Sequence, residues 1–114
     1  MKSNKNIVLI GMMGSGKSSI GKLLSKKLNL TFIDIDQKIE ESEDTKISEI
    51  FTKYGEDYFR KIEEKISLKF LSSENSVISL GGGGFINALI RKTCKKNCLS
   101  FWLDWKNETI IKRI

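Results

Sequence analysis

Short apolar runs rich in β-branched residues constrain the fold of this 114-residue chain more than any other feature. Three of them cover residues 6–10, 31–35 and 76–80, and an aromatic-rich fourth run covers residues 98–103. Apolar runs of this length are typical of strands that are buried on both faces of a parallel sheet. We therefore expect four strands, most of them parallel and central.

The segments between these runs carry apolar residues at helical spacing. Three sets recur at intervals of three and four residues: Ile20, Leu23, Leu24 and Leu28; Ile47, Ile50, Phe51 and Tyr54; Phe59, Ile62, Ile66 and Phe70. This spacing predicts three helices with one apolar face each, and a further helix is expected to start near Lys106. Strands that alternate with helices predict a single α/β domain over residues 1–114, with helices on both faces of a parallel sheet.

The composition excludes several kinds of chemistry. The chain contains no histidine, which rules out nucleophile systems that depend on histidine and zinc sites that need imidazole. Its two cysteines, Cys94 and Cys98, match neither a zinc pattern nor a C-x-x-C redox motif. No apolar run approaches the roughly 20 residues of a membrane span, and no signal peptide is visible, so a cytoplasmic protein without a membrane partner is expected.

The chain is basic, with 20 Lys and Arg against 14 Asp and Glu. Much of the excess lies in residues 91–96 and 106–113. No aromatic residues are interleaved with these charges, and no recognition helix accompanies them. A solvated basic surface is therefore the favoured interpretation, and no nucleic-acid partner is expected.

A glycine-lysine loop follows the first expected strand. Residues 11–18 match the pattern G-x-x-x-x-G-K-[ST], and an amphipathic helix follows them. Its glycines allow backbone amides to approach phosphate oxygens, and the start of the helix favours negative charge. Lys17 is expected to reach the β- and γ-phosphates and Ser18 to bind Mg²⁺. The loop predicts a nucleoside-triphosphate site.

Two carboxylates, Asp34 and Asp36, end the second expected strand. Ligands of an open parallel sheet bind beyond the carboxyl ends of its strands, and residues two apart on an extended segment point the same way. One carboxylate could support the hydration of Mg²⁺ while the other accepts a proton from an attacking hydroxyl. Two solvated aspartates at a strand end are the alternative.

Arg60 and the glycine run of residues 81–84 are two further candidates. Arginine is rare in this lysine-rich chain, and its planar fork suits a carboxylate or phosphate that is bound in a bidentate manner. Pairing of Arg60 with Glu56, Glu63 or Glu64 on a helix surface is the alternative. The glycine run follows the third expected strand, so it is either a flexible turn or a place where backbone amides approach a ligand.

These segments together resemble the shikimate kinases, a family of small phosphate-loop kinases whose three-layer P-loop NTPase fold is similar to that of nucleoside monophosphate kinases. Four stretches carry the resemblance, in the family's order: GMMGSGKSSIGKLLSKKL, FIDIDQKIEE, ISEIFTKYGEDYFRKIEE and VISLGGG. The combination of all four is specific to the family, whereas the glycine-lysine loop alone is shared by many enzymes.

The resemblance implies transfer of the ATP γ-phosphoryl group to the 3-hydroxyl of shikimate, in the route to chorismate and the aromatic amino acids, with Mg²⁺ as cofactor. It implies a monomer and a shikimate-binding helical segment over about residues 34–62. Asp36 is implied as the general base, and Lys17 as the second catalytic residue. Ser18 and Asp34 are implied at the metal. The residues implied at ATP are Gly14, Ser15, Gly16, Lys17, Ser18, Ser19 and Arg113, the last stacking on adenine.

The resemblance also implies a shikimate site in which Arg60 holds the carboxylate and Gly82 donates its amide. The residues implied around shikimate are Asp36, Phe51, Phe59, Arg60, Glu63, Gly81, Gly82 and Gly83.

The chain departs from the family in three ways. Ser19 replaces a more usual threonine, and Gly84 extends the glycine triplet to four, which is expected to loosen that turn. The family continues beyond this point into a mobile lid with further arginines, so the fold is expected to be incomplete at its C-terminus, with nucleotide binding retained and slow turnover. A non-catalytic nucleotide-binding fragment is one alternative. A gluconate kinase is the other, although such kinases usually carry a histidine near the second-strand acid.

Overall fold

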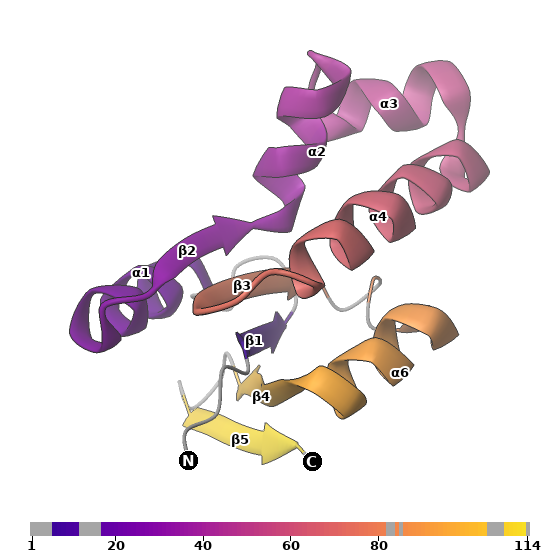
Figure 1. The fold of residues 1–114 in the computed structure, drawn as a ribbon. Coiled ribbons are helices and arrows are strands. Elements are labelled where there is room, and N and C mark those ends of the chain that lie inside the picture. Colours follow the sequence, from indigo (N-terminus) through magenta and orange to yellow (C-terminus); the bar gives the residue numbers. More distant parts are fainter. Residues whose placement is uncertain (1–5, 12–16, 82–83, 85, 105–108, 114) are drawn as a thin grey trace.

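A five-stranded sheet forms the centre of the computed structural model, which describes residues 6–11, 17–81, 84, 86–104 and 109–113 (Figure 1). The strand order across the sheet is β2-β3-β1-β4-β5. The first four strands along the chain run parallel, and β5 is antiparallel to β4. The strands are β1 (Asn6–Gly11), β2 (Thr31–Asp34), β3 (Ser76–Gly81), β4 (Cys98–Asp104) and β5 (Thr109–Arg113).

Helices connect the parallel strands and lie on both faces of the sheet. Those named here are α1 (Lys17–Leu28), α2 (Ile35–Glu43), α3 (Ile47–Tyr54), α4 (Glu56–Leu71) and α6 (Ala88–Asn97). Figure 1 shows α2 and α3 extending past the carboxyl end of β2, while α4 returns toward the sheet. The expected α/β architecture is confirmed.

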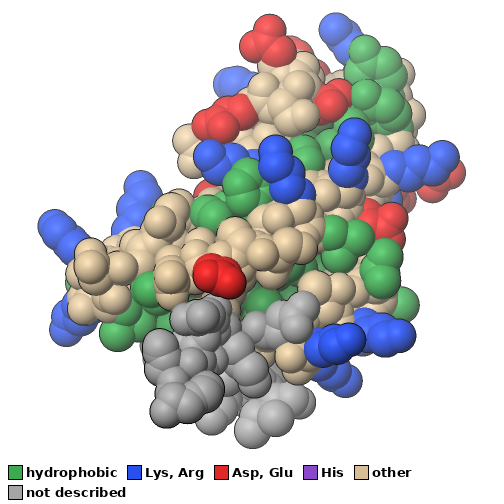
Figure 2. Space-filling view, viewed as in Figure 1, with side chains coloured by type: hydrophobic (Ala, Val, Ile, Leu, Met, Phe, Trp, Pro, Cys, Tyr) green, Lys and Arg blue, Asp and Glu red, His purple; other side chains and the backbone are tan. Residues whose placement is uncertain are grey.

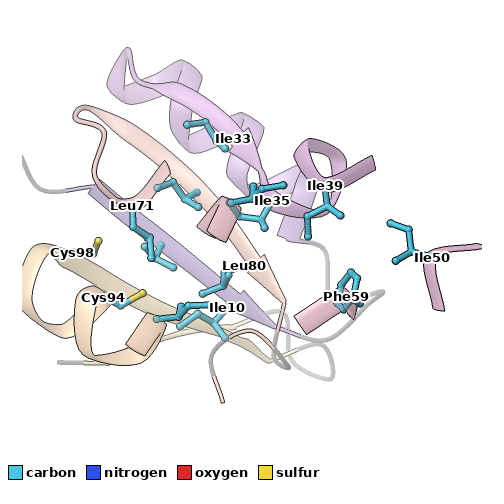
Figure 3. Close-up of a cluster of buried hydrophobic side chains, with 14 residues drawn as sticks. Ile10, Ile33, Ile35, Ile39, Ile50, Phe59, Leu71, Leu80, Cys94 and Cys98 are labelled. Carbon is cyan, nitrogen blue, oxygen red and sulfur yellow. The ribbon is translucent and has the colours of Figure 1, made fainter. Parts of the chain in front are cut away.

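The main core lies between the sheet and the helices α4 and α6. Val8 and Ile10 of β1 and Ile78 and Leu80 of β3 are fully buried there, because alternate residues of a strand face the same side. Figure 3 shows this cluster continuing from the two cysteines at one end to Ile50 and Phe59 at the other. The core therefore runs from α6 into the helical segment α2–α4.

The opposite face of the sheet is covered by α1. Phe32 alternates with the core residue Ile33 on β2, so its ring points to this other side, where it meets Gly21 of α1. A Cβ atom at position 21 would lie 2.3 Å from Cε1 of Phe32. Glycine therefore allows α1 to approach β2 more closely than any other residue would.

A buried amide ties the amino end of β1 to the connection between α4 and β3. Asn6, which is 2% exposed, donates from Nδ2 to the carbonyl oxygens of Leu71 and Ser73, at 3.3 and 2.7 Å. Its Oδ1 accepts the backbone N–H of Ser76 at 3.0 Å. One side chain thus satisfies three backbone groups that helix and sheet leave unpaired.

The four expected strands are all present, but two details of the prediction were wrong. The second strand ends at Asp34 rather than at residue 35, because α2 begins at Ile35. The segment after Lys106, expected to be helical, contains the strand β5 instead. Its β-branched residues Thr109, Ile110 and Ile111 suit a strand, and β4 offers an edge for antiparallel pairing.

The three helices predicted from apolar spacing are present, but some of their apolar residues, including Tyr54 of α3, are exposed. Ile50, Phe59 and Ile66 are buried as expected, whereas Leu23 and Leu28 of α1 are 55% and 50% exposed. The apolar spacing did not predict helices α2 and α6, although α2 lies within the helical segment of about residues 34–62 that the resemblance implied. Each buries few apolar residues, Ile35 and Ile39 in one and Ile90 and Cys94 in the other, which is too sparse a pattern for a helical period to stand out.

None of the described helices has both the length and the apolar character that crossing a bilayer requires. Part of the basic excess gathers on α6, where blue side chains lie together at the lower right of Figure 2. The residues on that side of the helix are Arg91, Lys92, Lys95 and Lys96.

Candidate active site

The carboxyl ends of β1, β3 and β2 lie next to one another at one edge of the sheet. Gly11 at the end of β1 is in register with Gly81 at the end of β3, and Asp34 at the end of β2 is in register with Ser79. Crossover helices leave a crevice beyond such an edge, which is where ligands bind in open parallel sheets. Gly11, Gly81 and the two aspartates therefore lie at the same end of the sheet.

Some of the expected ATP-binding residues belong to the part of the chain that the structure describes. Lys17, Ser18 and Ser19 form the first turn of α1, directly after the loop that follows β1. The loop glycines Gly14 and Gly16 and the intervening Ser15 lie outside the described residues, as do Gly82 and Gly83 of the second glycine run. Arg113, the expected adenine contact, lies on β5 in register with Ser100 of β4.

The two aspartates lie close together, but not for the reason expected. Asp34 is the last residue of β2, whereas Asp36 already belongs to the first turn of α2, so they do not share one face of an extended strand. Instead, Oδ1 of Asp34 accepts the backbone N–H of Asp36 at 3.0 Å and that of Gln37 at 3.4 Å. Asp34 is therefore the N-cap of α2.

Arg60 on α4 is held by two glutamates of its own helix. Its Nη1 donates to Oε1 of Glu63 at 2.8 Å, and its Nε lies 3.5 Å from Oε2 of Glu56. The guanidinium also lies over the ring of Phe59, 5.3 Å from its centroid, and 40% of the side chain is exposed. The helix-surface pairing considered for Arg60 is thus present, and it leaves the guanidinium partly open to solvent.

The Arg60–Glu63 pair joins an exposed charge to a buried one. Only 5% of the Glu63 side chain is exposed. Burial raises the pKa of Glu63 above its ordinary value, Arg60 offsets part of this effect, and the charge of Asp36 raises the pKa further. Burial by itself lowers the pKa of Arg60, but Glu63 and Glu56 outweigh it and raise that pKa above its ordinary value. Glu63 therefore interacts electrostatically with both Arg60 and Asp36.

Gly84, the fourth glycine of the run, lies against the same glutamate. A Cβ atom at position 84 would be 3.1 Å from Oε2 of Glu63 and 3.1 Å from Cδ1 of Leu80. Gly84 itself is buried and has little space for a side chain, while the neighbouring residues 82, 83 and 85 of the turn expected to be loose lie outside the described residues. The sequence shows that a fourth glycine follows the triplet of residues 81–83, but only the fold shows that this glycine lies against Glu63.

Two aromatic rings from different helices form an apolar wall near Arg60. Phe51 of α3 and Phe59 of α4 have ring centroids 4.7 Å apart, inclined by 32°. Phe59 is buried, whereas Phe51 is 38% exposed. The wall, the guanidinium and the Asp36 carboxylate could together receive a small polar molecule that carries a negative charge.

A distant structural likeness bears on the fold alone. The gluconokinase of Sinorhizobium meliloti has a TM-score of 0.56 and 20% sequence identity to this chain, covering 90% of this chain and 58% of its own. The fold is therefore similar to that of gluconokinase, which says nothing about activity or substrate.

The more similar proteins described next are all shikimate kinases. A "Shikimate kinase" family model matches residues 13–114. The shikimate kinase of Persephonella marina is 47% identical over 109 residues, which are 96% of this chain and 66% of that protein. The chain thus spans just under two thirds of that relative's length.

Two solved structures support the same relationship. Shikimate kinase from Aquifex aeolicus has a TM-score of 0.82 and 41% identity, with 87% of this chain and 59% of that chain covered. Shikimate kinase from Acinetobacter baumannii, solved in complex with shikimate, has a TM-score of 0.84 and 34% identity, with 87% of this chain and 55% of that chain covered. The family model matches most of the chain, and the fold agrees with the P-loop NTPase architecture of these neighbours. This chain therefore belongs to the shikimate kinase family.

Proposed function

We propose that the protein transfers the γ-phosphoryl group of ATP to the 3-hydroxyl of shikimate, forming shikimate 3-phosphate and ADP. The observation that carries the proposal is Arg60, a partly exposed guanidinium that is backed by the buried Glu63 and lies over Phe59. It is found in a chain whose fold matches the Acinetobacter enzyme solved with shikimate at a TM-score of 0.84. Shikimate carries a carboxylate, which a planar guanidinium binds in a bidentate manner.

The chain carries the side chains and glycines that a shikimate site needs. Arg60 would bind the carboxylate, while Phe51 and Phe59 would pack against the ring. Asp36 would accept hydrogen bonds from the ring hydroxyls, and Glu63 would hold Arg60 in place. The glycines after β3, Gly81, Gly82 and Gly83, would present backbone amides to the substrate. The helical segment of about residues 34–62, with α2, α3 and the start of α4, would form one wall of this site.

The proposed reaction is an in-line displacement at phosphorus. The oxygen of the shikimate 3-hydroxyl forms a bond to the γ-phosphorus while the bond from the γ-phosphorus to the β–γ bridging oxygen breaks, so that ADP leaves with that oxygen. The hydroxyl proton passes to the carboxylate of Asp36, and a positioned base of this kind contributes typically 10²–10⁴-fold. Lys17 and the amides of the loop, with Gly14, Ser15, Gly16, Ser18 and Ser19, would hold the phosphates, and Arg113 would lie near the adenine.

The residues at this edge suit a magnesium ion. In the part of the chain that the structure describes, Oδ2 of Asp34 forms no hydrogen bond or ion pair, and Ser18 stands in the first turn of α1. Mg²⁺ prefers such oxygen donors and keeps several waters, so it needs no cluster of three protein ligands, and none occurs among the described residues. When bound, Mg²⁺ would neutralise part of the negative charge of the ATP phosphates. We assign Ser18 and Asp34 to this ion.

We further propose that the protein works in the cytoplasm as a monomer, within the route to chorismate. Both substrates are small polar molecules that occur in water. Size-exclusion chromatography with light scattering would give the mass of the protein in solution, and the mass of a dimer would contradict this part of the proposal.

Product analysis tests the proposed reaction. The protein is incubated with ATP, Mg²⁺ and shikimate, and shikimate 3-phosphate and ADP are quantified by mass spectrometry. We expect them to appear in equal amounts, and Asp36→Asn to lower the rate roughly 10²–10⁴-fold while shikimate still binds. Lys17→Ala should weaken nucleotide binding.

A matched reaction with gluconate in place of shikimate is the control. Phosphorylation of gluconate, or ATP consumption that does not depend on shikimate, would contradict the proposal. Nucleotide binding without any binding of shikimate would favour a nucleotide-binding protein that lacks this activity.

A further inference from the structure

The backbone around Asp34 joins the sheet to the helix that carries Asp36. Asp34 has extended dihedrals, φ −103° and ψ 112°, and it is paired in register with Ser79 of β3. Helix α2 begins at the next residue, Ile35. The position of Asp34 is therefore determined by the sheet, and α2 starts from that point.

The side chain of Asp34 reaches forward onto the first turn of this helix. Its Oδ1 accepts the N–H of Asp36 at 3.0 Å and of Gln37 at 3.4 Å, the two amides that an N-cap residue serves. One of these amides belongs to the residue assigned as general base. Ile35 and Ile39, 1% and 0% exposed, fix the rotation of α2 about its axis. The cap and the two isoleucines thus fix the backbone position of Asp36.

We propose that Asp34 is a positioning residue for the general base: by capping α2 it fixes the place of Asp36, independently of any contact with Mg²⁺. The inference rests on the proposed function, because it concerns the base of that reaction. The two roles use different atoms. Both cap bonds fall on Oδ1, whereas Oδ2 is the oxygen available to the hydrated ion. Substitutions can therefore separate capping from metal binding.

Serine and alanine at position 34 form the matched pair. Both lack a carboxylate and both remove the metal contact, but only serine can cap a helix. Asp34→Asn is the third variant, since asparagine caps as well as aspartate does. The measurement is the dissociation constant of shikimate by calorimetry, without nucleotide and without Mg²⁺, so that no effect can pass through the ion.

We expect Asp34→Ala to weaken shikimate binding roughly 5-fold, within a range of about 2- to 30-fold, as the loss of an N-cap implies. Asp34→Ser and Asp34→Asn should stay within about 2-fold of the unchanged protein. With ATP and Mg²⁺ present, Asp34→Ser should keep the KM for shikimate while kcat falls. Amide hydrogen exchange at Asp36 and Gln37 should be faster in Asp34→Ala only.

Equal loss of shikimate affinity in the serine and alanine variants would overturn the inference, because the carboxylate rather than the cap would then matter. Unchanged affinity in Asp34→Ala would overturn it as well. If Asp34→Ala does not fold, Asp34→Thr against Asp34→Val repeats the comparison, since these two also differ in one hydroxyl. Failure of the unchanged protein to bind shikimate would contradict the proposed function instead, and amide exchange at Asp36 would still decide whether Asp34 is the cap.

Discussion

The ring of Phe32 on β2 occupies the space that a side chain on Gly21 of α1 would need, with Cε1 at 2.3 Å from the Cβ position. The same helix begins with Lys17 and Ser18, and the same strand ends at Asp34. The close contact between Gly21 and Phe32 therefore sets the distance between the start of α1 and the end of β2.

Gly21→Ala is expected to destabilise the protein by about 1–3 kcal/mol, because the added methyl group forces α1 away from Phe32. The better helix propensity of alanine offsets about 1 kcal/mol at most. Urea denaturation measures the change. In a Phe32→Leu background the added cost of Gly21→Ala should shrink, and an equal cost in both backgrounds would show that the ring is not responsible.

Asn6→Ala is expected to cost about 2–5 kcal/mol of unfolding free energy, because it leaves an N–H and two carbonyl oxygens without their partner in the interior. Asn6→Asp should be worse, since a carboxylate would face the carbonyls of Leu71 and Ser73. Ser72→Ala, an exposed change in the same connection, should stay within about 0.5 kcal/mol. Chemical denaturation of all three variants checks the order, and equal values for Asn6→Ala and Ser72→Ala would refute it.

The unfolding free energy should depend on pH through Glu63. Because burial raises the pKa of Glu63, the folded state holds a proton at pH values where the unfolded chain has already lost it. The contribution of Glu63 to the unfolding free energy is thus fully present below the ordinary glutamate pKa of about 4.3. It is lost as the pH rises through the higher pKa that Glu63 has in the folded state.

Glu63→Gln should remove that slope, while Glu64→Gln on the same helix serves as the neighbouring control. Denaturation at a series of pH values gives the slopes. Since Arg60 holds down the pKa of Glu63, Arg60→Met should raise that pKa further, which carbon NMR of the carboxyl group measures. A lowered pKa in that variant would contradict the ion pair.

Arg60→Lys is expected to weaken shikimate binding roughly 10- to 100-fold, although the charge is kept. A lysine offers a point charge, so it cannot bind a carboxylate with two parallel hydrogen bonds while contacting Glu63. The KM for ATP should change little, which separates this effect from general damage. Arg91→Lys on α6 is the matched control and should leave both values unchanged; similar losses in the two variants would argue against a carboxylate at Arg60.

Much of the fold follows from neighbouring residues. The apolar runs that became β1, β3 and β4 are composed of residues that suit buried strands, and the face with Phe59 and Ile66 keeps helical spacing over several turns. Helix α6 and strand β5 were not predicted because they depend on contacts with other parts of the chain. Ile90 of α6 packs into the core, and β5 pairs with β4. Such partners are not visible in a short window of sequence.

Some features of the candidate site could likewise be predicted from the sequence, and others could not. Lys17 and Ser18 belong to a contiguous motif, and Asp34, Asp36 and Arg60 stood out by type and position. That Asp34 caps the helix of Asp36 could not be foreseen, because it depends on where β2 stops. That Gly84 lies against Glu63 could not be foreseen either, because 21 positions and a whole strand separate them.

The amino-acid sequence by itself therefore determined the class of fold, the phosphate loop and the family, since each of these is written in consecutive residues or in their spacing. The tertiary structure alone decided which carboxylate caps a helix, which glutamate is buried behind Arg60 and how near α1 lies to β2. These are distances between segments far apart in the chain, and packing sets them rather than local propensity. Gly21 shows the difference: its place in a helix is a local matter, but its need to be glycine comes from a ring on another strand.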